Sequence, residues 1–255
     1  MHIETHGSGP ALVLIHGWAM HSGLFAPLVR ALDGRVALHL VDLPGHGRSR
    51  GQSLPEPDAL VDALVQRVPS GAVWAGWSLG GLVALQAAQR HPAQVAAVAA
   101  IASNPRFVTG PDWKHGVETH VFGQFAQGLE GDFERTIERF LALEAMGSDQ
   151  AGGHLRELRE QVFQHGAPDL AALRRGLELL ESVDLRAAVA QLAQPSLWIA
   201  GRRDRLVPPA AMRWAAQTAT DARYLEFPTG HMPFLADAPA VAQALLDLVQ
   251  QVAPR

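Results

Sequence analysis

Continuous hydrophobic runs recur along the chain and predict the strands of a buried sheet. The first run, Ala-Leu-Val-Leu-Ile, shows no alternation between polar and apolar residues. Runs of this length and composition are typical of parallel strands that are buried on both faces. The expected strands cover residues 11–15, 36–42, 72–75, 95–102, 195–201 and 223–227.

Between these strands, apolar residues are spaced as on one face of a helix. The expected helices cover residues 24–32, 58–68, 79–91 and 238–252. Strand and helix therefore alternate, which predicts an α/β fold with a mostly parallel sheet and helices on both faces. Ligands bind such sheets outside the carboxyl ends of the strands, so chemistry is expected in the loops that follow them.

The pattern changes between residues 104 and 184. Buried strand runs disappear, and the segment becomes charged and helical, most clearly at 132–146 and 154–164. We interpret residues 107–182 as a helical lid, inserted into a core that residues 1–106 and 183–255 form together.

Composition narrows the possible functions. With 21 basic and 25 acidic residues, the formal charge of −4 gives no overall attraction for nucleic acid or an anionic membrane. The absence of cysteine excludes disulfides, thiolate metal sites and cysteine nucleophiles. The chain has no basic leader and no apolar run of about 18 residues. We therefore expect a cytoplasmic protein with neither nucleic-acid nor membrane partners. We also expect a monomer, although the composition does not bear on the oligomeric state.

A candidate nucleophile follows the strand at 72–75, in the motif Gly76-x-Ser78-x-Gly80. A strand, a tight turn with one serine and a helix make up a nucleophile elbow, which raises the serine hydroxyl above the sheet edge. Glycine suits the positions two before and two after Ser78, because a Cβ there would clash with neighbouring backbone. In a chain with 24 glycines the motif alone would be weak, so the strand before it and the helix after it are what support it.

A serine needs a base to become nucleophilic, and the base needs an orienting acid. After an elbow, the acid is expected beyond a later strand and the histidine beyond the last strand. Asp204 and His231 occupy those positions. His231 would accept the Ser78 proton and return it to the leaving alkoxide, while Asp204 would fix the histidine tautomer and stabilise the imidazolium.

Asp204 also has a simpler interpretation. Its neighbours Arg202, Arg203 and Arg205 could make it a salt-bridged loop residue. The main alternative position for the acid follows the strand at 95–102, but Asn104 stands there. We therefore expect Asp204 to be the acid.

The oxyanion of an acyl-transfer intermediate needs two preorganised N–H donors. One is expected from the backbone of Leu79, directly after the nucleophile, and the other from Trp18, in the loop after the first strand. Trp18 is also a candidate for an aromatic side chain in the pocket wall, and the two roles are compatible.

Twelve histidines make any single histidine in a loop a weak signal. We interpret His46, His91 and His165 as structural or solvated. Two pairs suggest metal ligands by their proximity in sequence, but their spacing is loose and no His-Glu-x-x-His motif is present. These pairs are His2 with His6 and His115 with His120. We expect no metal site.

Four motifs together resemble the α/β-hydrolase superfamily, and the resemblance spans the whole chain. They are His16-Gly17-Trp18, Asp42-Leu43-Pro44-Gly45-His46-Gly47-Arg48-Ser49, Gly76-Trp77-Ser78-Leu79-Gly80-Gly81 and Gly230-His231-Met232-Pro233-Phe234. The resemblance implies an α/β-hydrolase fold with an inserted helical lid.

Longer stretches are similar to the pimeloyl-[acyl-carrier protein] methyl ester esterase family of biotin biosynthesis. They are residues 39–45, 76–83, 135–143, 176–178 and 183–186. The stretch at 135–143 is the most specific, because lids vary widely within the superfamily. The resemblance implies a serine carboxylesterase that hydrolyses the methyl ester of a pimeloyl chain on acyl-carrier protein, releases methanol and needs no cofactor.

The same resemblance implies which residues contact the substrate. They are Trp18, Ser78, Leu79, Phe140, Leu141, Ala142, Leu143, Glu144 and His231. Three arginines of the predicted lid, Arg135, Arg139 and Arg156, match the family's contacts with the carrier protein. One further arginine of the family, near Gly152, is missing here.

The spacing of the first two arginines supports a docking role independently. Arg135 and Arg139 stand four residues apart on one helix, so their guanidinium groups share a face and could bind carboxylates or a phosphate. A solvated helix face is the alternative interpretation, because Glu134 and Glu138 could pair with neighbouring cations.

The residues leave other functions open. A generalist short-chain carboxylesterase, active on small esters, and a carbon–carbon bond hydrolase would use the same three residues on the same fold. A non-catalytic binding protein of this fold is the alternative from another class. Dehalogenases and epoxide hydrolases are disfavoured, because Ser78 stands where those enzymes use aspartate.

Overall fold

The computed structural model describes residues 1–32, 34–149 and 151–253. Positions 33, 150, 254 and 255 lie outside the described residues, the last two at the end of the range expected for the core. Seven strands form one sheet in the order β1-β3-β2-β4-β5-β6-β7. The strands are β1 (His2–His6), β2 (Ala11–Ile15), β3 (Ala37–Asp42), β4 (Ala72–Trp77), β5 (Val95–Ile101), β6 (Ser196–Gly201) and β7 (Ala222–Phe227).

All neighbouring strands except β1 and β3 pair in parallel, so the predicted α/β fold with a mostly parallel sheet is confirmed. Every residue of β4 and β6 is buried, which explains their continuous apolar sequences. The sequence analysis missed β1, an antiparallel edge strand. Its residues, His-Ile-Glu-Thr-His, contain a single large apolar side chain, so they give almost no hydrophobic signal.

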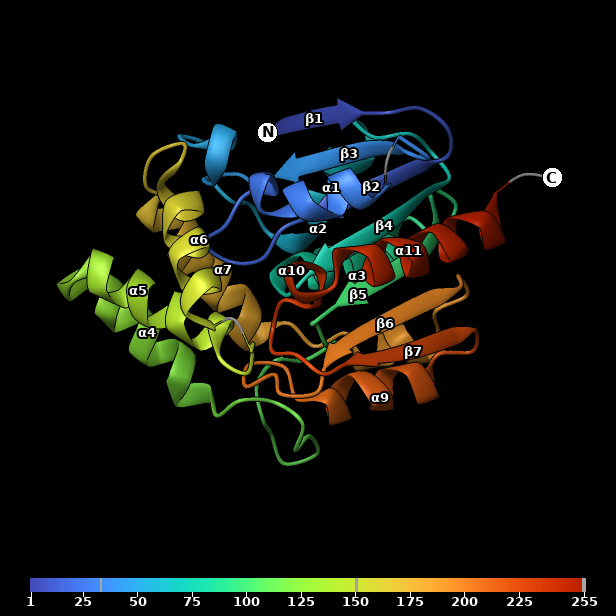
Figure 1. Ribbon diagram of the computed structural model, residues 1–255. Coiled ribbons are helices and arrows are strands. Elements are labelled where there is room, and N and C mark those ends of the chain that lie inside the picture. The colour runs from blue at the N-terminus through green and yellow to red at the C-terminus, as the bar shows by residue number, and fades with distance from the viewer. Residues whose placement is uncertain (33, 150, 254–255) are drawn as a thin grey trace.

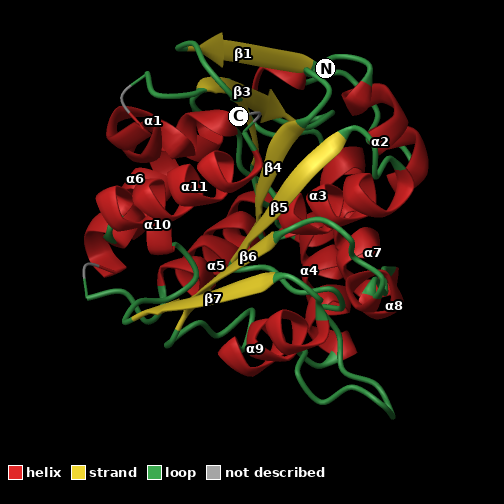
Figure 2. Ribbon diagram, turned by 90° about the vertical axis from the view of Figure 1, so that its right-hand side faces the viewer, coloured by secondary structure: helices red, strands yellow, loops and turns green. Residues whose placement is uncertain are grey.

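Helices cover both faces of the sheet (Figure 2). On one face, α1 (Ala26–Leu32), preceded by the short η1 (Ser22–Phe25), packs against α11 (Ala238–Val252). On the other face, α3 (Leu79–Arg90) packs against β4 and β5 and contacts α2 (Pro57–Val65). The remaining core helices are η2 (Gly47–Ser49), α8 (Arg186–Ala190), α9 (Pro209–Thr218) and α10 (Pro233–Ala236).

Four helices between β5 and β6 gather at the end of the sheet to which the parallel strands point (Figure 1). They are α4 (Thr119–Gly131), α5 (Phe133–Ala145), α6 (Ala151–Phe163) and α7 (Leu170–Ser182), and we call them the inserted helices. Two of them, α5 and α6, agree closely with the predicted helices at 132–146 and 154–164. They lie at the carboxyl ends of the strands, where a ligand of this fold is expected.

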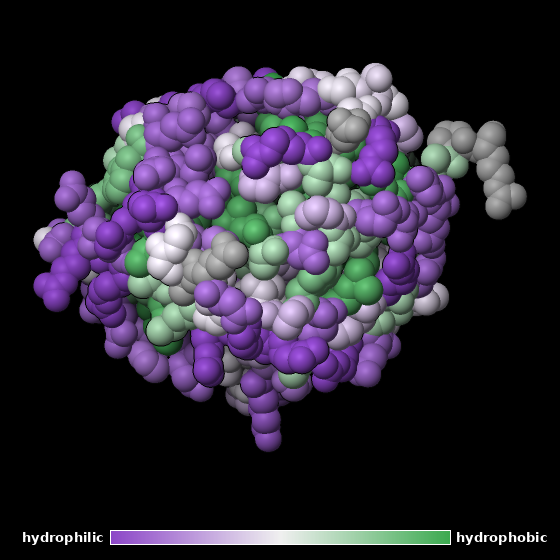
Figure 3. All heavy atoms as spheres, viewed as in Figure 1, coloured by the Kyte–Doolittle hydropathy of each residue, from purple (hydrophilic) through white to green (hydrophobic). Residues whose placement is uncertain are grey.

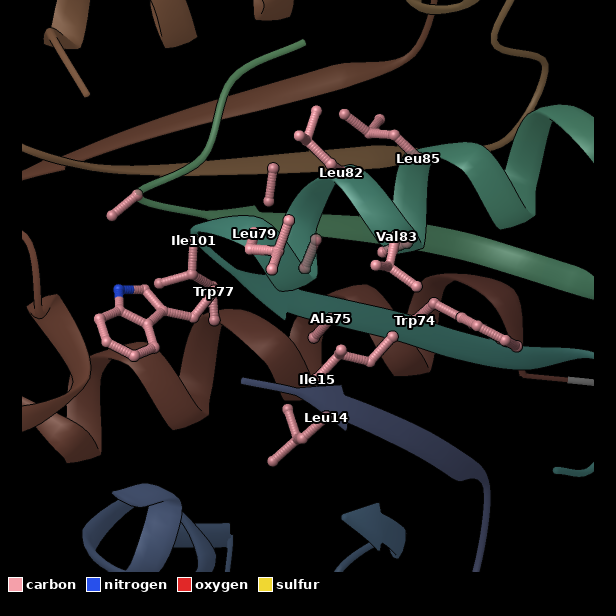
Figure 4. Close-up of a cluster of buried hydrophobic side chains, with 14 of the residues drawn as sticks. Leu14, Ile15, Trp74, Ala75, Trp77, Leu79, Leu82, Val83, Leu85 and Ile101 are labelled. Atoms are coloured by element: carbon pink, nitrogen blue, oxygen red, sulfur yellow. The ribbon is translucent and has the colours of Figure 1, made fainter. Parts of the chain in front are cut away.

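The core surrounds the junction of β4 and α3 (Figure 4). Side chains of β2, β4, β5 and α3 meet there, and Trp74 and Trp77 are fully buried. Since the serine lies between these two elements, its turn is anchored in the buried core. None of the described helices is long and apolar enough to cross a membrane.

Candidate active site

Ser78 lies at the junction of β4 and α3 with an unusual backbone conformation. Its φ of 53° and ψ of −119° fall in a region that L-residues rarely occupy. Only three described non-glycine residues have a positive φ, and Ser78 is one of them. The strained turn is therefore present where the elbow motif predicts it.

The two glycines of the motif have no room for a side chain. A Cβ on Gly76 would lie 2.0 Å from the carbonyl oxygen of Gly80, and a Cβ on Gly80 would lie 2.2 Å from that of Ile15. The turn thus needs glycine at both positions because backbone from α3 and β2 occupies the space. This close packing holds Ser78 at a defined height above the sheet.

Asp204 and His231 are brought together from the loops after β6 and β7. His231 Nδ1 lies 2.8 Å from Asp204 Oδ2, and both side chains are almost completely buried. The other aspartate oxygen, Oδ1, accepts the backbone N–H groups of Leu206 and Val207 at 2.8 and 2.9 Å. Three donors therefore stabilise the ionised carboxylate, which leaves the Nδ1 proton on the histidine facing it.

The arginines beside Asp204 do not bind it. Arg202 forms an ion pair with Glu226, and Arg203 forms one with Asp149. The interpretation of Asp204 as a salt-bridged surface residue is therefore not what the structure shows. Its carboxylate points inward to the histidine instead.

His231 Nε2, the atom that would face a nucleophile, is buried and has no hydrogen-bond partner among the described residues. Trp77 joins the histidine loop to the elbow, because its indole N–H donates to the His231 carbonyl at 2.8 Å. The two rings lie 5.4 Å apart between centroids. Since Ser78 directly follows Trp77, the structure places serine, histidine and aspartate on adjoining segments.

The loop after β2 lies against the nucleophile. A Cβ on Gly17 would be 3.1 Å from the Cβ of Ser78, so the backbone of the next residue, Trp18, runs beside the serine. Neither the Trp18 nor the Leu79 backbone N–H donates to a backbone acceptor among the described residues. Both amides are therefore free to stabilise an oxyanion.

His16 holds this loop in place through two contacts of its ring nitrogens. Its Nδ1 lies 2.7 Å from the Gly17 carbonyl, and its Nε2 accepts the Leu43 N–H at 2.9 Å. These contacts require a proton on Nδ1 and none on Nε2, which is the neutral imidazole. Burial, and after it the neighbouring His46, lower the pKa of His16 to about 3. His16 is thus a structural residue that the sequence analysis recognised only as part of a motif.

Aromatic side chains form the wall between the elbow and the inserted helices. The Trp18 ring meets Phe140 of α5 edge-on, with 4.5 Å between centroids, and its indole N–H donates to the Leu173 carbonyl at 2.7 Å. Gly176 of α7 lies so close to Trp18 that a Cβ would be 2.6 Å from the indole ring. Trp18 is therefore packed between the elbow and two of the inserted helices, and its predicted role in a pocket wall stays a prediction.

The stretch Phe140 to Glu144 contains both buried and half-buried positions. Phe140, Leu141 and Glu144 are buried, while Ala142 and Leu143 are intermediate. The stretch thus contributes to the interface between α5 and the core. The structure contains no ligand, so the predicted contacts with substrate stay predictions.

Two buried polar residues have surroundings that the sequence analysis did not predict. Asn104, after β5, has both amide atoms buried without a partner among the described residues, as does Glu144 for both carboxylate oxygens. The sequence did contain a signal that the glutamate is buried. Positions 137, 140, 141 and 144 form the apolar stripe of α5, and Glu144 is the one charged residue on it.

The three predicted docking arginines are exposed on the inserted helices. Within the described residues, no carboxylate lies within 4.0 Å of Arg135, Arg139 or Arg156. Glu138 pairs instead with Arg159, at 3.2 Å. The surface at α4 and α5 is mostly hydrophilic (Figure 3). These exposed cations fit docking of an acidic partner and fit a solvated helix face equally well, so the docking role stays a prediction.

Metal ligands do not gather in the described part of the chain, where no group of three histidine or acidic side chains could hold an ion.

Comparison with known proteins first assigns the chain to a broad class of proteins. The chain belongs to the alpha/beta hydrolase fold family, which matches residues 10–238. Solved structures agree on the fold: an esterase from Exiguobacterium antarcticum superimposes with a TM-score of 0.86 at 18% identity, over 97% of this chain and 94% of that one. An enol-lactonase from Burkholderia xenovorans LB400 gives 0.85 at 22% identity, over 98% and 96%.

Curated relatives then define the narrower family. The chain is 54% identical over its full length, and over 98% of the relative, to the pimeloyl-[acyl-carrier protein] methyl ester esterase of Stenotrophomonas maltophilia. The protein of the same name from Xanthomonas campestris is 54% identical over 96% of this chain and 97% of its own. This chain is a member of that esterase family, which confirms the resemblance found in the sequence.

Proposed function

We propose that this protein hydrolyses the methyl ester of pimeloyl-acyl-carrier protein, yielding pimeloyl-acyl-carrier protein and methanol in biotin biosynthesis. The observation that carries the proposal is the full-length similarity to esterases of that name, together with a buried Asp204–His231 pair beside the strained serine. No cofactor is required by this chemistry.

In the proposed mechanism, Ser78 Oγ attacks the ester carbonyl carbon while His231 Nε2 accepts its proton. The backbone N–H groups of Trp18 and Leu79 stabilise the oxyanion of the tetrahedral intermediate. The carbon–oxygen bond to the methoxy group then breaks, and His231 returns the proton to form methanol. Water, deprotonated by His231, hydrolyses the acyl-enzyme and releases Ser78.

We assign the inserted helices the role of a lid, residues 107–182, over a core of residues 1–106 and 183–255. The acyl chain would lie between them, along Trp18 and the stretch 140–144, with its distal ester at Ser78. A carrier protein is too large to enter, so it would stay outside on Arg135, Arg139 and Arg156. The thioester near the carrier would thereby be spared.

We place the enzyme in the cytoplasm as a monomer that binds neither nucleic acid nor membrane. The net charge of −4 supports the absence of nucleic-acid and membrane binding, because it offers no general attraction for polyanions. Light scattering with and without added carrier protein would measure the oligomeric state directly.

The decisive experiment compares two substrates and two proteins. Hydrolysis of carrier-bound pimeloyl methyl ester and of a short p-nitrophenyl ester is measured for the wild type and for Ser78→Ala. We expect a preference for the carrier-bound ester, and a loss of about 10⁶ in kcat on both substrates in the variant. A Ser78→Ala protein with the wild-type melting temperature ensures that the loss is chemical.

The other outcomes identify the alternatives. Serine-dependent activity on the small ester alone would contradict the biotin assignment and indicate a generalist carboxylesterase. Activity on a dienol ketone alone would indicate a carbon–carbon bond hydrolase. If Ser78 is not labelled by a fluorophosphonate and neither ester is hydrolysed, the protein is a non-catalytic binding protein.

A further inference from the structure

The serine and the histidine of the candidate active site come from strands that are not neighbours. Ser78 directly follows β4 and His231 follows β7, and β5 and β6 lie between these strands in the sheet. Three strand spacings of about 4.8 Å separate β4 from β7 by roughly 14 Å. Proton transfer needs the two side chains within hydrogen-bond reach. The histidine loop must therefore return across the sheet and be held there.

The indole of Trp77 connects the two segments. Trp77 is the last residue of β4, directly before Ser78, and its Nε1–H donates to the His231 carbonyl at 2.8 Å. No backbone N–H group of the described residues donates to that carbonyl. Within the described part of the chain, Trp77 therefore supplies the donor that holds the main chain of the histidine.

The Trp77 ring system also packs against two loops of the site. The Trp77 and His231 rings lie 5.4 Å apart between centroids, and Phe234, three residues after His231, meets Trp77 edge-on at 5.5 Å. A Cβ on Gly17 would lie 2.9 Å from both Cε3 and Cζ3 of Trp77. One fully buried side chain therefore contacts the histidine loop and the loop that carries Trp18.

His231 thus has two anchors with different consequences. Asp204, in the loop after β6, lies 2.8 Å from ring atom Nδ1, while Trp77 holds the main chain. The contact with Asp204 sets the orientation of the ring. It does not fix the distance to Ser78, because the loops after β6 and β7 both come from beyond β5 and can move together. Trp77 is covalently joined to Ser78, so its hydrogen bond constrains this remaining distance.

We propose that Trp77 is a positioning residue that sets the distance between Ser78 and His231, with its indole as a rigid spacer from the elbow to the histidine main chain. The proposal rests on the catalytic function proposed for these two residues. A tryptophan side chain has only two rotatable bonds, and full burial restricts both, so the spacing varies little. Without the indole N–H, the buried His231 carbonyl would lack a donor, and the loop would shift toward another partner.

Trp74 provides a matched control. It lies in the same strand, three residues before Trp77, and both side chains are fully buried. The Nε1 atom of Trp74 has no hydrogen-bond partner among the described residues. In Figure 4, Trp77 lies at the carboxyl end of β4 and Trp74 lies farther back along the strand. The same substitution at both positions therefore isolates the hydrogen bond to His231.

The most selective change replaces Trp77 by β-(3-benzothienyl)alanine, a sulfur isostere that keeps both fused rings and has sulfur in place of the N–H group. Trp77→Phe removes the N–H group and one ring, and it needs no unnatural amino acid. Both changes are also made at Trp74. For each protein, kcat and KM on a short p-nitrophenyl ester, the rate of fluorophosphonate labelling of Ser78 and the melting temperature are measured.

We expect the sulfur isostere at position 77 to lose about tenfold in kcat, and Trp77→Phe to lose about 100-fold, with KM within about twofold in both. The labelling rate should fall in parallel, since this reagent also reacts with a serine that His231 activates. The isostere at position 74 should keep all three quantities within about twofold. Trp74→Phe should lower the melting temperature through the cavity it leaves, but keep kcat within about twofold.

Two results would overturn the positioning role. One is wild-type kcat and labelling in the sulfur isostere at position 77. The other is an equal loss at positions 74 and 77, which would indicate a general effect of core substitutions.

His231→Ala distinguishes these results from failure of the proposed function. If this variant were as active as the wild type on the small ester, the catalytic function itself would be refuted, and the role of Trp77 with it. If it were inactive while the isostere at position 77 stayed fully active, only the positioning role would be refuted. The small ester makes the test independent of whether the natural substrate is carried by a protein.

Discussion

At the scale of single residues, the elbow depends on the lack of room for side chains beside Ser78 rather than on favourable contacts. Ser78 adopts its strained conformation because α3 and β2 close around the turn, and the glycines on either side of it are contacted by backbone atoms. Backbone cannot move aside as a flexible side chain can. The motif is therefore a steric requirement that even the smallest side chain violates.

A pair of glycine-to-alanine substitutions tests this requirement. Gly80→Ala places a Cβ 2.2 Å from the Ile15 carbonyl, so we expect a loss of about 3 kcal/mol in the free energy of unfolding and of nearly all esterase activity. Gly123→Ala, inside α4 with open space around it, should instead raise the free energy of unfolding by about 1 kcal/mol. Urea denaturation of both variants measures the contrast, and equal effects would contradict the steric explanation.

At the scale of the elements, α5 has two faces with separate uses. Its buried stripe carries Phe140 against Trp18, while its outer face carries Arg135 and Arg139. Arg139 lies over the ring of Phe125 of α4, with 5.9 Å from its guanidinium carbon to the ring centroid. Such a stacked guanidinium keeps its charge and its hydrogen-bond donors available to a partner.

Reversing the charge of two arginines on α5 tests docking of the carrier protein separately from ester hydrolysis. The double variant Arg135→Glu, Arg139→Glu should raise KM for carrier-bound substrate by about 10- to 100-fold and leave hydrolysis of a small ester within about twofold. The reason is that only the large substrate reaches the outer face. The effect should weaken as salt is added, since exposed charges are screened.

A double variant of equal charge change, Arg35→Glu with Arg223→Glu, is the control. These exposed residues lie next to the amino ends of β3 and β7, away from the inserted helices. Equal loss on both substrates in the α5 variant, or equal loss of carrier-linked turnover in the control, would refute docking on α5.

At the scale of the whole molecule, burial of histidines makes the fold sensitive to acid. Burial lowers the pKa of His16 to about 3, and burial also lowers the pKa of His21 and of His46. The unfolded chain binds these protons below about 6.5, whereas the folded protein does not. The stability that these groups contribute is therefore complete above pH 6.5 and is lost as the pH falls toward the folded pKa values.

His46→Phe should reduce this acid sensitivity. The ring is fully buried and its Nε2 has no partner among the described residues, so an apolar ring of similar size gives up only the hydrogen bond between Nδ1 and the Pro44 carbonyl. Below pH 6.5 the free energy of unfolding of the variant should fall less steeply than that of the wild type, by up to about 1.4 kcal/mol per pH unit. Urea denaturation at pH 5, 6, 7 and 8 measures the slopes, with His120→Gln at an exposed position as the control. Parallel slopes for His46→Phe and the wild type would contradict the prediction.

The parallel strands, the elbow and the chain positions of Ser78, Asp204 and His231 could all be predicted from sequence patterns. Each of these follows from local signals: a buried strand is continuously apolar, a strained turn requires glycine, and catalytic loops follow strands. The edge strand β1 was not predicted, because an edge strand needs few apolar side chains. Its pairing with β3 also leaves no signal in the residues of β1 themselves.

The interactions between residues far apart in the chain became apparent in the folded molecule. It showed that Asp204 binds His231 and not its neighbouring arginines, and that the indole of Trp77 donates to the carbonyl of a histidine that comes much later in the chain. Ion pairing and hydrogen bonding depend on distance and on exclusion of water, and both are set by the packing of the elements on one another. Neither the distances nor the exclusion of water can be read directly from the order of the residues.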